Sequence, residues 1–366
     1  MSCSDDIDPT SGTIGTTAQS ISNQVNGTQI LYGSQYLHRP PVPIVTIEEQ
    51  CLASLTFGAM NDRSLEIKKP TAGTCEWLFQ HKEWERWQSS PGDLMWIKGK
   101  PGSGKSTLLR YAEHELKKMG AKNNALTLSF FFHGHGEELQ RIPFGMYRSL
   151  LCQILKHEPA SLPQLVETFA CKQNEKHDSG ATWKWDPNHL GNLLDWAIDD
   201  ILGSRPIWLF IDGLDECGPE GAEEILQRLN RLRRPGLFIC VSCRYDSLRN
   251  SDGGFQIKVE EHNKYDIVKY AQSQLAHLES KTAFSIPDLI ATYSDGCFSS
   301  ACLAVERLRG VEIGMEAREI EDTVKQMINS APQDLKSLLP QSSPATLGRF
   351  RALWHQGNGL PLRKRH

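Results

Sequence analysis

Residues 99–107 read Gly99-Lys-Pro-Gly-Ser-Gly-Lys-Ser-Thr107, and this stretch decides the fold that we expect. It fits the pattern G-x-x-x-x-G-K-[ST], whose glycines allow a tight turn with successive backbone N–H groups pointing at phosphate oxygens. An apolar run of strand length precedes it at 94–97, and apolar residues recur at helical spacing over 108–112. A strand, a glycine-rich turn and a helix start are the setting that a phosphate-binding loop needs.

Each polar residue of this loop has an expected role. Lys105 would lie between the β- and γ-phosphates, Ser106 would offer its hydroxyl to Mg²⁺, and the positive end of the following helix would favour the anion. We therefore predict that the loop binds ATP or GTP together with magnesium. The residues predicted to contact the nucleotide are Gly99, Gly102, Ser103, Gly104, Lys105, Ser106 and Thr107.

The rest of the folded part alternates between apolar strand-like runs and helical patterns. Strands are expected at 126–132, 207–211 and 237–241. Helices are expected at 142–157, 162–176 and 187–202, with an amphipathic helix at 74–87 before the first strand. Continuous apolar runs are typical of strands buried on both faces of a parallel sheet, so the pattern predicts a doubly wound α/β domain with flanking helices.

Carboxylates follow the strand expected at 207–211. Asp212-Gly-Leu-Asp-Glu216 stands at the carboxyl edge, where α/β sheets place their ligands. Asp212 is positioned to hold Mg²⁺ through water together with Ser106, and Asp215 or Glu216 would polarise a water for γ-phosphate hydrolysis. An acidic cap on the next helix is the alternative interpretation.

An arginine follows the next strand along the chain. Arg244 would reach the γ-phosphate and report its hydrolysis, whereas a surface salt bridge is the competing interpretation. We predict Asp215, Glu216 and Arg244 as the catalytic residues.

Composition disfavours several classes of function. The chain has 366 residues, 39% of them apolar, which is enough for a substantial core. A formal charge of -4 and a pI near 6.3 give none of the basic field that nucleic-acid binding requires. No apolar run approaches the ~20 residues of a membrane span, and the first residues lack the blocks of a signal peptide. We expect a cytoplasmic protein with no nucleic-acid partner and no membrane span.

Two short motifs point only weakly to metal or redox chemistry. Cys240-Val-Ser-Cys243 fits C-x-x-C, but residues three apart in a strand point to opposite faces. His133-Gly-His135-Gly136 offers two histidines with no apparent third ligand. We expect neither motif to hold a metal.

The N-terminal segment differs in composition from everything that follows. From Pro9 to Leu37 there is no charged side chain, and the Ser, Thr, Asn, Gln and Gly content suits a disordered arm or a short cross-β stacking segment. Arg39-Pro-Pro-Val-Pro43 then predicts a stiff extended linker.

Taken together, these residues resemble the NACHT class of signal-transduction (STAND) P-loop NTPases, especially the fungal receptor-like group with a nephrocystin-like ATPase core. The resemblance covers roughly residues 50–310. The stretches that carry it are Leu55-Thr-Phe, Met60-Asn-Asp-Arg63, Gly73-Thr-Cys-Glu-Trp-Leu78, the loop from Trp96 to Leu109, Ser129-Phe-Phe-Phe132, Arg148-Ser-Leu-Leu151, Phe210-Ile-Asp-Gly-Leu-Asp-Glu-Cys217, and Asn263 with Asp266-Ile-Val-Lys-Tyr270.

The resemblance implies an AAA-like sheet, with Arg63 and Thr74 near the base or ribose and Arg244 in the first sensor position. Gly296-Cys-Phe298 would open the contact of a small helical domain with the nucleotide. Family members usually continue into a winged-helix domain and repeats, so the end at His366 implies a shortened protein. Some members carry an N-terminal motif that templates amyloid in a partner, which implies self-association or a partner protein for the uncharged segment.

We expect five regions: an arm and linker (1–43), a helical lead-in (44–90), the NTPase core (91–260), a small helical domain (261–330) and a shortened tail (331–366). The favoured function is a nucleotide switch that hydrolyses ATP or GTP slowly, in a fungal innate-immunity or heterokaryon-incompatibility type of pathway. A shortened scaffold that binds nucleotide without switching, and a small-molecule kinase, remain alternatives. Against the kinase, Asp215 and Glu216 suit activation of water, and no Arg-rich lid is apparent.

Overall fold

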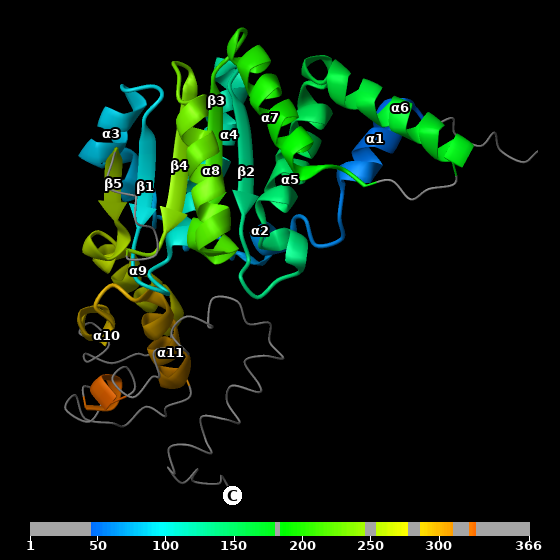
Figure 1. Cartoon of the computed structure of the whole chain (residues 1–366). Coiled ribbons are helices and arrows are strands. Elements are labelled where there is room, and N and C mark those ends of the chain that lie inside the picture. The colour runs from blue at the N-terminus through cyan, green and yellow to red at the C-terminus, as the bar shows by residue number, and fades with distance from the viewer. Residues whose placement is uncertain (1–44, 180–183, 246–253, 277–285, 310–321, 327–366) are drawn as a thin grey trace, which may run out of the picture. The chain divides into compact units, whose positions relative to one another are not determined.

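The strand that leads into the phosphate loop lies within a five-stranded parallel sheet with the order β2-β3-β4-β1-β5 (Figure 1). The computed structural model describes residues 45–179, 184–245, 254–276, 286–309 and 322–326. The strands are β1 (Leu94–Lys98), β2 (Leu126–Phe131), β3 (Ile207–Asp212), β4 (Leu237–Cys243) and β5 (Phe255–Lys258). This order confirms the predicted parallel α/β fold of the AAA-like type.

The central strands are buried because both of their faces carry apolar side chains. All five residues of β1 are buried, and β4 pairs with it on one side from Leu94↔Ile239 onward. The edge strand β5 was not predicted: its sequence Phe-Gln-Ile-Lys is short, and only Ile257 is buried. A strand of this length gives too weak a pattern to separate from a loop.

Helices cover both faces of the sheet. One face is covered by α1 (Ile47–Leu55), α5 (Pro143–His157), α6 (Pro163–Ser179), α7 (Pro187–Leu202) and α8 (Gly218–Leu232). The other face is covered by the 3-10 helix η1 (Glu76–Gln80), α3 (Lys82–Gln88) and α4 (Lys105–Asn123). Cys240 belongs to the core on the second face and Cys243 to the core on the first, so the two thiols lie on opposite sides as expected.

Three of the predicted helices begin at the proline residues that mark helix starts in the sequence. α5, α6 and α7 each begin at a proline, which fits the first turn because its missing N–H would have no partner within the helix. Asp186 caps α7 by accepting the backbone N–H of His189. The short helix α2 (Asp62–Glu66) was not predicted.

The prediction of one helix over 74–87 is wrong. η1 and α3 are separated at His81, whose backbone is extended and whose Nδ1 accepts the N–H of Glu83 to cap α3. The break lets Trp77 turn toward the following domain while Trp84 and Trp87 remain buried in the sheet core. The apolar residues of both helices recur at helical spacing, so the sequence pattern predicts one continuous helix and does not reveal the change of direction at His81.

A separate apolar cluster follows the sheet in the chain. It is formed by α9 (Lys264–Leu275), α10 (Ile286–Ser294) and α11 (Phe298–Leu308), together with Val324. These helices lie within residues 261–330, where a small helical domain was expected. The arm and linker at 1–43 and the tail at 331–366 lie outside the described residues. Among the helices that are described, none has the length and apolar character to cross a membrane.

Candidate functional site

The phosphate loop, residues 99–107, joins β1 to α4 as predicted. Gly102 and Gly104 have φ of 73° and 99°, which other residues rarely adopt. A Cβ on Gly99 would lie 2.6 Å from Ser103 Oγ and 2.7 Å from Glu260 Oε2, so that glycine is required for space. The backbone therefore turns tightly between the strand and the helix.

The first turn of α4 presents unpaired backbone donors to this loop. Gly104 stands at the N-cap and has no side chain to cap the helix, and the first turn contains no acidic residue. The first N–H groups of any helix have no acceptor within that helix. The positive end of α4 thus faces the turn, an arrangement that favours an anion.

Lys105 lies within the loop that precedes it. Its Nζ donates to the carbonyls of Gly99 and Lys100, both at 2.9 Å. Burial lowers the pKa of Lys105, and the charges of Asp212 and Asp215 oppose that shift. The ammonium is held on the loop, close to the acidic end of β3.

Asp212 ends β3 next to β4 and is 2% exposed. The hydroxyl of Ser242 donates to Asp212 Oδ1 at 2.5 Å and accepts the N–H of Gly213 at 2.8 Å. Ser242 was not among the predicted site residues, although its position at the end of a strand, two residues before Arg244, was a signal for it. The serine fixes the direction of the carboxylate at the edge of the sheet.

Asp215 and Glu216 are neighbours in the chain but have different partners. Asp215 Oδ2 lies 3.3 Å from Arg244 Nε, and Asp215 Oδ1 accepts the backbone N–H of Arg244 at 3.3 Å. Glu216 Oε2 instead accepts the N–H of Gly134 at 2.6 Å. Burial raises the pKa of Glu216, the Gly134 bond opposes that shift, and the nearby charge of Asp212 adds to it. The structure therefore brings the three predicted catalytic residues to one edge, with Arg244 in a salt bridge.

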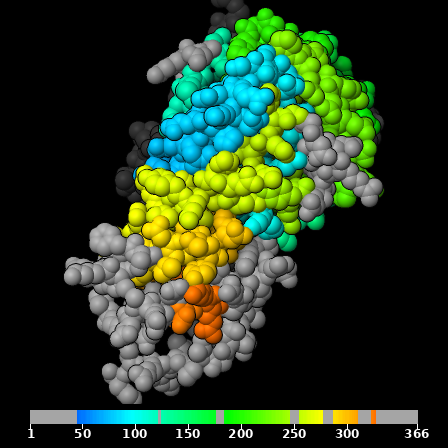
Figure 2. Space-filling model, turned by 90° about the vertical axis from the view of Figure 1, so that its left-hand side faces the viewer, coloured from blue at the N-terminus to red at the C-terminus, as the bar shows by residue number. Residues whose placement is uncertain are grey.

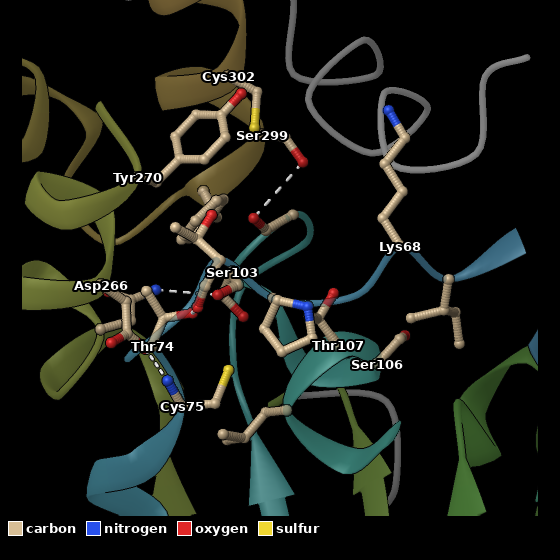
Figure 3. Close-up of a pocket in the computed structure, with 18 of the residues that line it drawn as sticks. Lys68, Thr74, Cys75, Ser103, Ser106, Thr107, Asp266, Tyr270, Ser299 and Cys302 are labelled. Atoms are coloured by element: carbon tan, nitrogen blue, oxygen red, sulfur yellow. Dashed lines mark hydrogen bonds between the residues drawn. The ribbon is translucent and has the colours of Figure 1, made fainter. Parts of the chain in front are cut away.

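A cavity of about 560 Å³ extends from the phosphate loop to the helices that follow the sheet (Figure 3). Ser106 and Thr107 line it at one end, and Tyr270, Ser299 and Cys302 line it from α9 and α11. The third wall is the segment 67–77, between α2 and η1.

Three residues named from the resemblance also line this cavity: Arg63, Thr74 and Phe298. The backbone N–H of Ser299, one residue beyond Phe298, donates to the carbonyl of Gly102 at 3.0 Å. The start of α11 therefore contacts the phosphate loop itself.

The segment 67–77 is fastened to α9. Asp266 Oδ2 accepts the N–H of Cys75 at 3.0 Å, as Figure 3 shows. The same oxygen accepts the indole N–H of Trp77 at 2.9 Å. Lys269 Nζ donates to the carbonyl of Gly73 at 3.2 Å. Burial raises the pKa of Asp266, and these hydrogen bonds oppose the shift. Asp266 lies in one of the stretches that carry the family resemblance, but its sequence context did not predict this role.

The phosphate loop and the acidic end of β3 offer groups that fit a magnesium-bound triphosphate. Ser106 lines the cavity, whereas Asp212 and the three predicted catalytic residues do not. The Ser106 hydroxyl and the Asp212 carboxylate supply oxygen, the ligand type that Mg²⁺ prefers. Ser103 also lines the cavity, and its Oγ is buried without a hydrogen-bond partner among the described residues. Those residues contain no cluster of three or more His, Cys, Asp or Glu side chains placed to bind another metal.

Part of the chain resembles known proteins in sequence. Residues 73–244 match the family described as "Nephrocystin 3, N-terminal". A stretch of 175 residues is 25% identical to the vegetative incompatibility protein HET-E-1 of Podospora anserina. It covers 46% of this chain and 12% of that protein, so the chain spans a small part of its relative.

Solved structures resemble the chain more loosely. A Walker-type ATPase of Pyrococcus abyssi matches with a TM-score of 0.43 and 14% identity, over 79% of this chain and 78% of that one. The PCH-2 protein of C. elegans matches with a TM-score of 0.35 and 13% identity, over 70% and 65% of the two chains. The nephrocystin match, which ends at Arg244, thus runs from the segment 67–77 to the last predicted catalytic residue.

Proposed function

We propose that this chain binds ATP or GTP with magnesium, hydrolyses it slowly, and works as a nucleotide-dependent signalling switch. The observation that carries the proposal is one continuous cavity, which begins at the uncapped first turn of α4 and ends between the segment 67–77 and α11. Its volume of about 560 Å³ lies within the range of small-molecule sites. We assign the phosphates to the end at the loop and the sugar with its base to the other end.

The phosphate end supplies the proposed contacts. Residues 99–107 hold the phosphates through backbone N–H groups and Lys105, while Ser106 and Asp212 hold magnesium. The metal, when bound, neutralises charge on the phosphate oxygens. Glu216, or else Asp215, accepts a proton from the attacking water, and Arg244 responds to the γ-phosphate once it exchanges its contact with Asp215.

The signalling role is supported by the similarity to HET-E-1, a vegetative incompatibility protein. We place the chain in a fungal innate-immunity or heterokaryon-incompatibility type of pathway and in the cytoplasm. We retain the division into a lead-in (44–90), a core (91–260) and a small helical domain (261–330), with self-association or partner binding assigned to the arm (1–43).

Phosphate release without an added acceptor tests this function. The purified chain is incubated with Mg²⁺ and ATP or GTP, and free phosphate and the hydrodynamic size are followed together. Slow release from the wild type, and a size that differs between the triphosphate and diphosphate forms, are expected. Binding without release would favour the scaffold, release only with a small-molecule acceptor would favour the kinase, and the absence of binding would contradict all three.

A further inference from the structure

Asn263 is buried between the phosphate loop and α11, and it has two backbone partners. Its Nδ2 donates to the carbonyl of Ser103 at 2.9 Å and to the carbonyl of Gly296 at 2.8 Å, and the side chain is 2% exposed. Rotating the amide would set its oxygen against two carbonyl oxygens, so the orientation of the side chain is fixed. One amide thus joins the loop to the turn before α11.

Because its side chain makes these two bonds, Asn263 does not cap α9. It stands at the N-cap of α9, where an asparagine oxygen usually accepts an N–H of the first turn. Here it makes no cap hydrogen bond, and Oδ1 is buried without a partner among the described residues. A buried polar atom left without a partner is unfavourable and calls for an explanation.

The geometry of the peptide group shows what this orientation of the Asn263 amide achieves. In a trans peptide the C=O and the next N–H point in opposite directions, and the described residues contain no cis peptide. Holding the carbonyl of Ser103 therefore fixes the direction of the N–H of Gly104, which points away from Asn263. Gly104 stands at the N-cap of α4 and lines the cavity.

A neighbouring peptide shows the contrast. The carbonyl of Gly102 is held by the N–H of Ser299, and the N–H of Ser103 is already donated to the carbonyl of Lys100 at 3.2 Å. Both polar groups of the Gly102–Ser103 peptide therefore have partners within the protein, and its N–H is not available to a ligand. The peptide held by Asn263 is the one whose N–H belongs to the start of α4.

We propose that Asn263 is a positioning residue that aims the N–H of Gly104 at the nucleotide phosphates and links their binding to the turn before α11. The inference rests on the proposed nucleotide site and adds a residue to it. Because the same amide holds Gly296, a displacement of the phosphate loop by bound phosphate is transmitted to the start of α11.

The test separates phosphate binding from base binding. Wild type, Asn263→Leu and Asn263→Ser are titrated calorimetrically with whichever of ATP and GTP the wild type binds more tightly, in Mg²⁺, and with the corresponding nucleoside. Leucine keeps the volume and removes both donors without adding charge, and serine keeps one donor in case leucine prevents folding. Gln153→Leu is the matched control, since its Nε2 donates to the carbonyl of Ser129 in β2.

Asn263→Leu should weaken triphosphate binding about ten- to a hundred-fold, the range for losing a hydrogen bond to a charged group, with nucleoside affinity nearly unchanged. Asn263→Ser should lie between leucine and wild type, and Gln153→Leu should lower the melting temperature without changing either affinity. A folded Asn263 variant that retains the wild-type ratio of the two affinities overturns the inference alone. A wild type that binds neither triphosphate overturns the proposed function, and the inference with it.

Discussion

The two ends of the cavity are built differently. The phosphate end is a continuous stretch, residues 99–107, set between β1 and α4. The far end, which we call the base end, joins the segment 67–77 to α9 through residues 191 positions apart, as in the bond from Cys75 to Asp266. A local loop carries its geometry in its own sequence, whereas the base end exists only after the chain has folded. Substitutions at the phosphate end should therefore weaken binding of the phosphates, and substitutions at the base end should weaken binding of the nucleoside.

The largest effect is expected for turnover at the phosphate end. Glu216→Gln should lower the hydrolysis rate by about 10²- to 10⁴-fold, the range for losing a general base, with little change in nucleotide affinity. Since burial raises the pKa of Glu216, the wild-type rate should fall as the pH is lowered through a value above the usual 4.5 of a glutamate. Phosphate release across pH measures both.

Asp215→Asn is the matched control for this experiment, because it removes a carboxylate that is paired with Arg244 rather than with Gly134. If Glu216→Gln hydrolyses at the wild-type rate while Asp215→Asn does not, Asp215 is the base and the assignment of Glu216 is wrong.

Removing the loop lysine should have the next largest effect. Lys105→Ala should weaken triphosphate binding about ten- to a hundred-fold, since a hydrogen-bonded charge is lost from the phosphates, and should leave nucleoside binding unchanged. Calorimetric titration of both ligands measures the difference. Equal loss for the nucleoside would mean that Lys105 supports the whole cavity rather than the phosphate end, and unchanged triphosphate binding would show that the cradle assignment is wrong.

The contrast between the two ends also explains what the sequence could predict. The glycines and Lys105 could be predicted because the structure of the loop depends directly on their spacing in the sequence. Asp212 could be predicted because it follows an apolar strand. Arg63 and Thr74 were placed only through the resemblance. The bonds of Asp266 and Asn263 depend on how α9 packs against the sheet domain, and no local spacing encodes that packing. The helix predicted over 74–87 failed for the same reason, since the break at His81 serves the distant contact of Trp77.

A smaller effect is expected from loosening the base end. Asp266→Ala removes the acceptor of Cys75 and Trp77. It should weaken binding of the preferred nucleoside triphosphate and of its nucleoside by the same factor, about three- to ten-fold for neutral hydrogen bonds, as calorimetric titration of both ligands would measure. Asp266→Asn keeps one acceptor oxygen and should weaken binding less. A loss confined to the triphosphate would contradict the assignment of this wall to the base.

The smallest effect is the pH dependence of stability that arises where η1 and α3 contact the residues just before α9. In Figure 2 the blue and yellow surfaces meet in this region. His81 Nδ1 accepts the N–H of Glu83, so neutral His81 carries its proton on Nε2 and donates it to His262 Nε2 at 3.2 Å. Protonating either ring sets two N–H groups against each other. Burial and the charge of His262 lower the pKa of His81, and Glu83 opposes that shift.

A lowered pKa in the folded state means that this contribution to stability is complete above the unfolded value of 6.5 and is lost as the pH falls through the folded value. His81 is partly exposed, so solvent screens the effect, and the wild-type melting temperature should drop by only about 1–2 °C more than that of His81→Asn between pH 7.5 and 5.5. Asparagine keeps an N-cap for α3 and does not titrate. Thermal unfolding of both proteins is measured at the two pH values. A steeper dependence for the wild type would confirm that this histidine contact responds to protons, and equal dependences for the two proteins would contradict it.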